Sequence, residues 1–105
     1  MVNTRRMGQR FEREAEKFLQ SNGFTTQRVK GSTKWNANCD FFGLFDIIAF
    51  SKEGWLLVQV KTVFLNKVKN EMKAWAEENK PPNCRILYMI RLRRKKEKWR
   101  LILIK

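Results

Sequence analysis

Apolar residues recur at helical spacing in two segments of the chain, which predicts two amphipathic helices. The first, Gly8–Ser21, is followed by Asn22-Gly23, a typical C-terminal cap. The second, Asn66–Asn79, ends before two prolines, which cannot continue a helix. The apolar positions of the first helix are Phe11, Ala15, Phe18 and Leu19. Those of the second are Val68, Met72, Trp75 and Ala76, and they indicate a buried face.

Five other segments have the β-branched and aromatic composition of strands. They span residues 24–30, 44–50, 55–62, 85–91 and 98–104, and a turn at Ser51–Gly54 predicts that the second and third form a hairpin. These two strands are apolar on both faces, so we expect them in the centre of a sheet. The order α-β-β-β-α-β-β, without an internal repeat, predicts one domain over residues 1–105, an α/β fold with a central mixed sheet flanked by helices.

Three polar residues interrupt the central strands: Asp46, Gln59 and Lys61. Burying even a neutral polar group without a partner costs roughly 2–7 kcal/mol. Alternate residues of a strand share a face, so Gln59 and Lys61 project together, and Asp46 comes from the strand expected alongside. A carboxylate, an amide and an ammonium are therefore predicted to converge. The alternative is structural: Asp46 caps a turn, and the other two form hydrogen bonds within the sheet.

This set of groups suits metal-dependent hydrolysis of a phosphodiester. Mg²⁺ prefers oxygen ligands and keeps several waters, so Asp46 is the natural first ligand and the Gln59 amide oxygen a weaker, neutral one. Lys61 would orient or deprotonate the attacking water. The chain has no histidine, which excludes Ser-His-Asp hydrolysis, zinc sites with histidine ligands and histidine-based nuclease mechanisms.

A further acid is expected from the first helix. Glu12 and Glu14 both flank its apolar stripe, one on each side, and periodicity does not choose between them. Either glutamate could equally form an ion pair with an arginine nearby.

The charge of the chain points to a polyanionic partner. Lys and Arg number 23 against 10 Asp and Glu, a net charge of +13, which favours nucleic acid over a solvated basic surface. No run approaches the ~18 apolar residues of a membrane span, so we expect no membrane attachment and a cytoplasmic location. Cys39 and Cys84 have no metal-ligand spacing and are interpreted as reduced. The basic groups expected to contact phosphates are Arg5, Arg6, Arg10 and Arg13, then Arg28, Lys30 and Lys34, and last Arg91–Arg100.

Several short motifs, taken in order, resemble one nuclease family. They are Gly8-Gln-Arg-Phe-Glu12-Arg13-Glu14, Asn22-Gly23-Phe24, Gly31-Ser32, Phe45-Asp46-Ile-Ile-Ala49 and Val58-Gln59-Val-Lys61. This pattern is similar to that of the archaeal-type Holliday junction resolvases of the PD-(D/E)xK nuclease superfamily, over roughly residues 8 to 62. The resemblance implies a restriction-endonuclease-like fold and a Mg²⁺- or Mn²⁺-dependent endonuclease acting on DNA in recombination and repair.

Carried over residue by residue, the resemblance implies Glu12 as the helix acid, Asp46, Gln59 and Glu12 as metal ligands, and Lys61 as the catalytic lysine. It also places Ser32 near the scissile phosphate. The sequence departs from the family pattern at Gln59, where the family has an acid, and in a longer loop, 33–44, whose Asp40 is a rival to Asp46. A nuclease fold that binds DNA without cutting it is therefore the alternative. The loop residue Trp35 would either stack on a base or anchor the loop.

A four-way junction has approximate two-fold symmetry, and its resolution requires two sites related by a dyad. The sequence supplies one site, so we expect a homodimer. Apolar residues of the second helix and of the last hairpin would form the interface or else belong to the core: Trp75, Trp99, Leu101 and Leu103.

Overall fold

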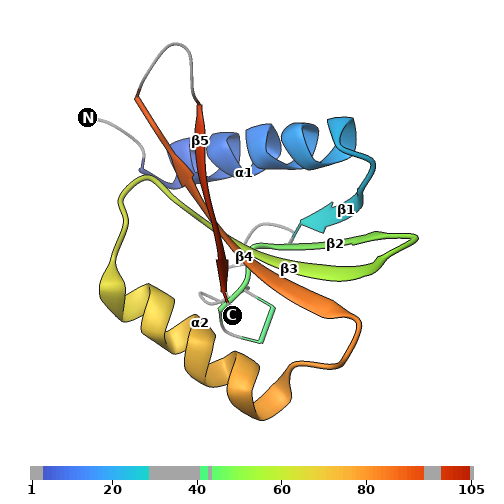
Figure 1. Ribbon diagram of the computed structural model, residues 1–105. Helices are drawn as coiled ribbons and strands as arrows, with labels where there is room; N and C mark the ends of the chain where they lie inside the picture. The colour runs from blue at the N-terminus through green and yellow to red at the C-terminus, as the bar shows by residue number, and fades with distance from the viewer. Residues whose placement is uncertain (1–3, 29–40, 43, 94–97, 105) are drawn as a thin grey trace, which may run out of the picture.

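The computed structural model describes residues 4–28, 41, 42, 44–93 and 98–104. The elements follow the predicted order α-β-β-β-α-β-β (Figure 1). They are α1 (Thr4–Ser21), β1 (Thr25–Arg28), β2 (Ile47–Ser51), β3 (Gly54–Lys61), α2 (Asn66–Asn79), β4 (Cys84–Arg91) and β5 (Trp99–Ile104). No helix in this described part of the chain is long and apolar enough to cross a membrane.

The five strands form one mixed sheet in the order β1-β2-β3-β4-β5. Strands β1, β2 and β3 are antiparallel neighbours, β3 and β4 are parallel and joined through α2, and β5 returns antiparallel to β4. Strand β3, in which residues 56–60 are all buried, is in the centre, as its two apolar faces predicted. Helix α1 covers one face of the sheet and α2 the other (Figure 1).

The core is divided between the two faces of the sheet, because alternate strand residues point to opposite sides. On the α1 side, Leu56, Val58 and Val60 of β3 pack with Ala15 and Leu19 of α1. On the α2 side lie Leu57 of β3, Met72 of α2 and the β4 residues Ile86, Tyr88 and Ile90. Gln59 and Lys61 share the parity of Leu57, so they project toward the α2 side.

Glycines follow the end of α1 and close the turn of the β2–β3 hairpin, as the sequence predicted. Gly23 has φ of +92°, and the chain closes back on the helix through the Phe24 amide, which donates to the Leu19 carbonyl at 3.1 Å. Gly54 has φ of +134°, and a Cβ there would collide with the carbonyl oxygen of Asn83. These two positions require glycine for different reasons, a left-handed cap and a close backbone approach.

The predicted boundaries are correct at both ends of α2 and at the ends of α1, β4 and β5. The other described boundaries differ from the prediction by one to four residues. Helix α1 begins at Thr4 rather than Gly8. Strand β2 begins at Ile47, so Asp46 lies immediately before the strand and not inside it. The reason is local: the Asp46 amide still donates to the Val58 carbonyl at 2.8 Å, but its carboxylate, rather than its backbone, binds the next β3 amide.

Candidate functional site

Asp46 and Gln59 meet where the pairing of β2 with β3 ends. Both residues are buried, with exposures of 8% for Asp46 and 6% for Gln59. Among the described residues, these two make up the buried polar and charged set. The last register pair is Ile47 with Val58, and beyond it Asp46 Oδ2 accepts a hydrogen bond from the Val60 amide at 2.8 Å. The carboxylate therefore replaces a main-chain acceptor that a continued β2 would have supplied.

The Gln59 amide lies directly against the Asp46 carboxylate. Oriented so that its nitrogen faces the surrounding acceptors, it donates to Asp46 Oδ2 at 3.2 Å and to the Leu44 carbonyl oxygen. Strand β3 holds Gln59 in place, because the residue is paired with Tyr88 of β4 on its other side. The predicted convergence of the carboxylate and the amide is thus present in the structure.

Lys61 is the last residue of β3, two positions after Gln59 and on the same face of the strand. Its backbone is paired with Ile90, and its side chain is exposed. The structure thus brings Asp46 and Gln59 together and leaves the Lys61 ammonium in solvent, where it can approach a phosphate.

The donor set at Asp46 fits a hard divalent cation. Neighbouring ligands of an octahedral Mg²⁺ with bonds of about 2.1 Å are separated by about 3 Å, and the Gln59 amide is 3.2 Å from Asp46 Oδ2. A half-turn of the amide would present its oxygen to a shared ion. Among the described residues there is no group of three or more His, Cys, Asp or Glu side chains that could hold a metal. Mg²⁺ needs no such group, because it keeps several waters and is bound through one or two carboxylates.

The two helix acids, which periodicity left equivalent, differ in the structure. Glu14 Oε2 accepts a hydrogen bond from Arg91 Nε at 2.8 Å, and Glu14 Oε1 is 3.6 Å from Arg10 Nε. The hydrogen bond from Arg91 lowers the pKa of Glu14 against the opposing effect of burial, with further lowering by the charges of Arg91 and Arg10. Glu14 therefore has a structural ion pair, and Glu12, half-buried one position before Arg13, is the acid that the resemblance selects.

The predicted phosphate contacts divide into described and undescribed residues. Arg13 and Arg10 of α1 are exposed, and Arg10 lies beside Glu14. Arg28 ends β1 and forms an ion pair with Glu16 at 3.1 Å. Arg5 and Arg6 lie within α1. The predicted residues that fall outside the described part are Lys30, Ser32, Lys34, Trp35, Cys39, Asp40 and positions 94–97 of the last hairpin.

Two residues of β4 have contacts that sequence reasoning did not predict. Tyr88 is fully buried beside Gln59, and its hydroxyl donates to the Val63 carbonyl and accepts from the Leu65 amide, each at 3.2 Å. Arg91, which we had grouped with the basic last hairpin, is only 19% exposed and pairs with Glu14. For Tyr88 the available signal was a tyrosine in an otherwise aliphatic strand. For Arg91 the sequence gave no signal, because its partner Glu14 is 77 residues away.

Comparison with known proteins places this geometry in a nuclease fold. The structure is similar to that of Hjc from Archaeoglobus fulgidus, a Holliday junction resolvase from an archaeal hyperthermophile, with a TM-score of 0.60 and 20% sequence identity. The match covers 91% of this chain and 76% of that chain. A search of curated proteins gave no match.

The sequence match is more specific than the structural one. The family model of the archaeal Holliday junction resolvase (Hjc) matches residues 3–104. The chain belongs to the archaeal Holliday junction resolvase family, which confirms the resemblance seen in its motifs.

Proposed function

We propose that this protein is a divalent-metal-dependent endonuclease that cuts branched DNA, with four-way junctions as its preferred substrate. The observation that carries the proposal is the meeting of two buried polar side chains, Asp46 and Gln59, at the end of the β2–β3 ladder in a chain of this family. Buried polar groups are costly, and a metal site gives these two a function.

In this proposal Asp46, Gln59 and Glu12 hold Mg²⁺ or Mn²⁺, which when bound supplies charge neutralisation and an acidified water. The residues of the chain do the rest. The β3–β4 ladder fixes the backbone of Gln59 and Lys61, the Val60 amide orients the Asp46 carboxylate, and the exposed Lys61 ammonium binds the phosphoryl oxygens or orients the attacking water.

Positive charge supplies the affinity for DNA. The net charge of +13 includes exposed arginines of α1, Arg10 and Arg13, which contact phosphates in this proposal. Phosphate contacts fix position without reading sequence, so the selectivity for a branched substrate comes from its shape.

A non-catalytic DNA-binding role is the second candidate, and one observation favours it. Gln59 stands where an acid would bring a second negative charge, and its amide nitrogen has two oxygen partners without any ion. A site that is satisfied as it stands binds metal more weakly than a pair of carboxylates.

The test is cleavage of labelled duplex, single-stranded, flap and four-way DNA with Mg²⁺, Mn²⁺ or EDTA. We expect metal-dependent cuts at the junction by the wild type and none by Asp46→Asn, which keeps an oxygen acceptor for the Val60 amide. Junction binding without cutting in either metal would support the second candidate. Equal cutting of linear duplex would support a nuclease and reject the junction preference.

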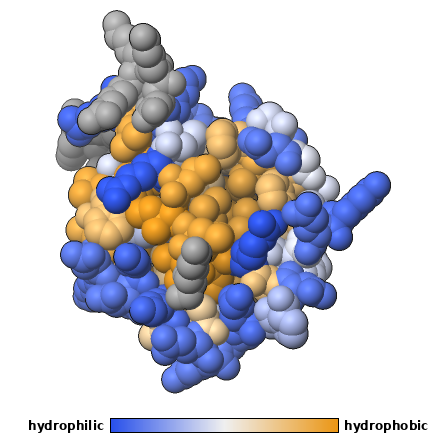
Figure 2. Space-filling model, in the orientation of Figure 1, coloured by the Kyte–Doolittle hydropathy of each residue, from blue (hydrophilic) through white to orange (hydrophobic). Residues whose placement is uncertain are grey.

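We further propose a homodimer, because a single chain supplies one site and a junction requires two. The structure separates the four apolar residues named above: Trp75 and Trp99 are half-buried against the core, and Leu101 and Leu103 are 47% and 46% exposed on the edge strand β5. Their register partners Met89 and Leu87 belong to the α1-side core. Figure 2 shows an apolar area on the face where β5 lies in front in Figure 1.

Light scattering tests this assembly. We expect the wild type to have the mass of a dimer at micromolar concentration and the double variant Leu101→Lys with Leu103→Lys to have that of a monomer. Phe50→Lys is the matched control, since Phe50 is 44% exposed on β2. A monomeric wild type, free and on the junction, would reject the dimer and leave the nuclease proposal in place.

A further inference from the structure

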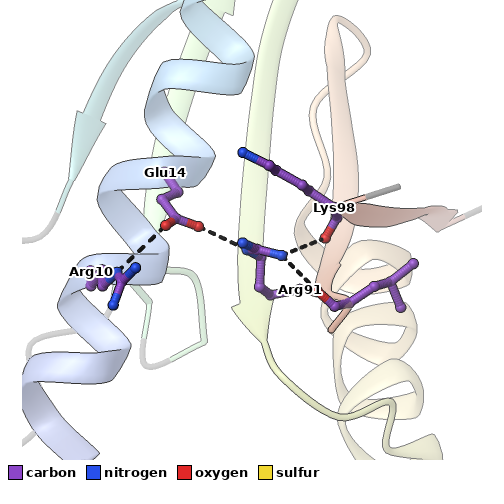
Figure 3. Close-up of polar contacts among 5 residues, drawn as sticks. Arg10, Glu14, Arg91 and Lys98 are labelled. Atoms are coloured by element: carbon purple, nitrogen blue, oxygen red, sulfur yellow. Dashed lines mark hydrogen bonds and ion pairs between the residues drawn. The ribbon is translucent and has the colours of Figure 1, made fainter. Parts of the chain in front are cut away.

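The arginines of the fold differ in whether a glutamate neutralises them. Arg91 has such a partner, because its Nε donates to Glu14 Oε2 at 2.8 Å, and Glu14 also lies beside Arg10 (Figure 3). The arginines with an ion pair of this kind are Arg10, Arg28, Arg85 and Arg91. Arg100 of β5 is exposed, and its side chain forms no ion pair or hydrogen bond with a described residue. Its charge and its donors are therefore available to a ligand.

Arg100 and Lys61 lie on the same face of the sheet, on either side of β4. Ile90 of β4 is the register partner of both, of Lys61 on β3 and of Arg100 on β5. Register partners project to the same face, and Ile90 belongs to the α2-side core, so both cations project to that side. Neighbouring strands are about 4.8 Å apart, which separates the two Cα atoms by about 10 Å. This is also the face to which Gln59 projects, two residues before Lys61.

An aromatic ring supports the Arg100 guanidinium. Its central carbon is 5.2 Å from the ring centroid of Phe64, a residue of the segment between Lys61 and α2. The Phe64 ring stacks on Tyr88, whose hydroxyl is hydrogen-bonded to the backbone on both sides of Phe64. A contact between a cation and a ring orients the guanidinium without using its N–H donors, which can then bind the oxygens of a phosphate.

The alternation of β5 separates Arg100 from the leucines of the proposed dimer contact. Leu101 and Leu103 are paired with residues of the α1-side core, whereas Arg100 is on the α2 side. A dimer formed through these leucines therefore leaves Arg100 on the other face of the strand.

We propose that Lys61 and Arg100 bind adjacent phosphates of one DNA strand, which crosses β4 on the α2 side of the sheet. This inference rests on the proposed function, which makes DNA the substrate and Lys61 a contact for its phosphate. Two unpaired cations on one face repel each other, and a polyanionic strand bound to both removes that repulsion. Two contacts define the direction of the strand as well as its position, and a single contact at Lys61 does not.

Neutral linkages in the DNA test this pair of contacts. Four-way junctions are made with a methylphosphonate linkage, in which a methyl group replaces a charged oxygen, at the same position of all four strands. The position is moved step by step through the branch point. Affinity is measured in EDTA, so that the proposed cleavage does not interfere, for the wild type, Lys61→Ala and Arg100→Ala. The matched control is Arg85→Ala, because Arg85 is an exposed arginine near the other end of the sheet, at the start of β4. Circular dichroism establishes that each variant is folded.

We expect the wild type to bind about tenfold more weakly when either of two adjacent linkages is neutral, since each change removes one charge-assisted contact. Lys61→Ala should lose its response to one of these linkages and Arg100→Ala its response to the other. Arg85→Ala should respond as the wild type does. Arg100→Lys keeps the positive charge and should regain a response at the linkage assigned to Arg100.

An Arg100→Ala variant that responds to every neutral linkage as the wild type does would overturn the inference. Assignment of Lys61 and Arg100 to linkages that are not adjacent would overturn it too, because Arg100 would then bind another part of the junction. A wild type that responds to no linkage would exclude both contacts. A wild type that binds the junction but never cuts it with Mg²⁺ or Mn²⁺ would reject the proposed function alone, since the neutral linkages report on binding and still decide whether the two cations share a strand.

Discussion

The two edges of β3 differ in a way that explains where the candidate site lies. Along β4 the parallel register runs without a break from Trp55 with Cys84 to Lys61 with Ile90. Along β2 the antiparallel register stops at Ile47 with Val58, and from there the Asp46 side chain binds the Val60 amide. Strand β4 pairs with β3 as far as Lys61, and we call this the supported edge of β3. Strand β2 stops pairing at Val58, and we call this the open edge, because beyond it the Asp46 side chain takes the place of a main-chain partner.

This difference combines rigidity with access. The β4 edge fixes the backbone of Gln59 and Lys61, so their side chains need no loop to position them. Pairing with β2 ends early, so the Asp46 carboxylate takes the place of a main-chain partner. This carboxylate and the Gln59 amide beside it remain able to bind a ligand. Residues in such a position satisfy the sheet and are also available for chemistry.

Removing the Asp46 charge, at the β2 edge of β3, should have the largest effect on cleavage. We expect Asp46→Asn to lose junction cleavage by about 10³-fold or more, since a metal ligand contributes several kcal/mol to the transition state. Junction affinity should stay within about twofold, because it comes from arginines and lysines. Asp46→Ala also leaves the Val60 amide without this acceptor and should lower the free energy of unfolding by about 1–3 kcal/mol. Urea denaturation beside single-turnover assays checks both effects, and cleavage retained by Asp46→Asn would contradict the assignment.

Replacing Lys61 tests the supported edge. Its side chain is exposed and its backbone belongs to the β4 ladder, so Lys61→Ala should change the stability by less than about 0.5 kcal/mol. Cleavage should fall by about 10²-fold or more through loss of the positioned ammonium. Lys67→Ala, an exposed lysine of α2, is the control for loss of one positive charge. Equal cleavage by both variants would remove Lys61 from the site.

The sequence was sufficient to predict the supported edge. Apolar runs, a glycine turn and a helical period predicted the order of elements along the chain, the hairpin and the bounds of α2, all of which depend on local patterns. The burial of Met72 and the packing of Trp75 followed from the same periodicity.

The open edge was only partly predictable. Alternation predicted that Asp46 and Gln59 face each other, but not that β2 begins only at Ile47, one residue after Asp46. A carboxylate that replaces a main-chain partner leaves no periodic signal in the sequence. Glu12 and Glu14 were equivalent on a helical wheel, and only the distant Arg91 distinguishes them. Contacts between residues far apart in the sequence depend on packing that no local pattern encodes.

Adding a negative charge at the open edge should strengthen metal binding there. Gln59→Glu places a second carboxylate against Asp46, in place of an amide that donates to it, so the metal-free variant should unfold at a lower temperature than wild type. Mg²⁺ should stabilise the variant more than the wild type and reach half-maximal cleavage at about tenfold lower concentration. Thermal unfolding across a Mg²⁺ series measures this, with the exposed Gln27→Glu as the control for charge. An unchanged metal midpoint would show that residue 59 is not a ligand.

The smallest effect should come from the supported edge, at Tyr88. Its hydroxyl donates to the Val63 carbonyl and accepts from the Leu65 amide, which fixes the segment directly after Lys61, and its ring stacks on Phe64 with centroids 5.8 Å apart. Tyr88→Phe keeps the ring and removes only the hydroxyl, so we expect a loss of about 1 kcal/mol in stability, from two hydrogen bonds that are partly exposed. Cleavage should fall by less than about tenfold, because the β4 ladder still holds the backbone of Lys61. A fall as large as that of Lys61→Ala would show that the segment after Lys61, rather than the ladder, positions the lysine.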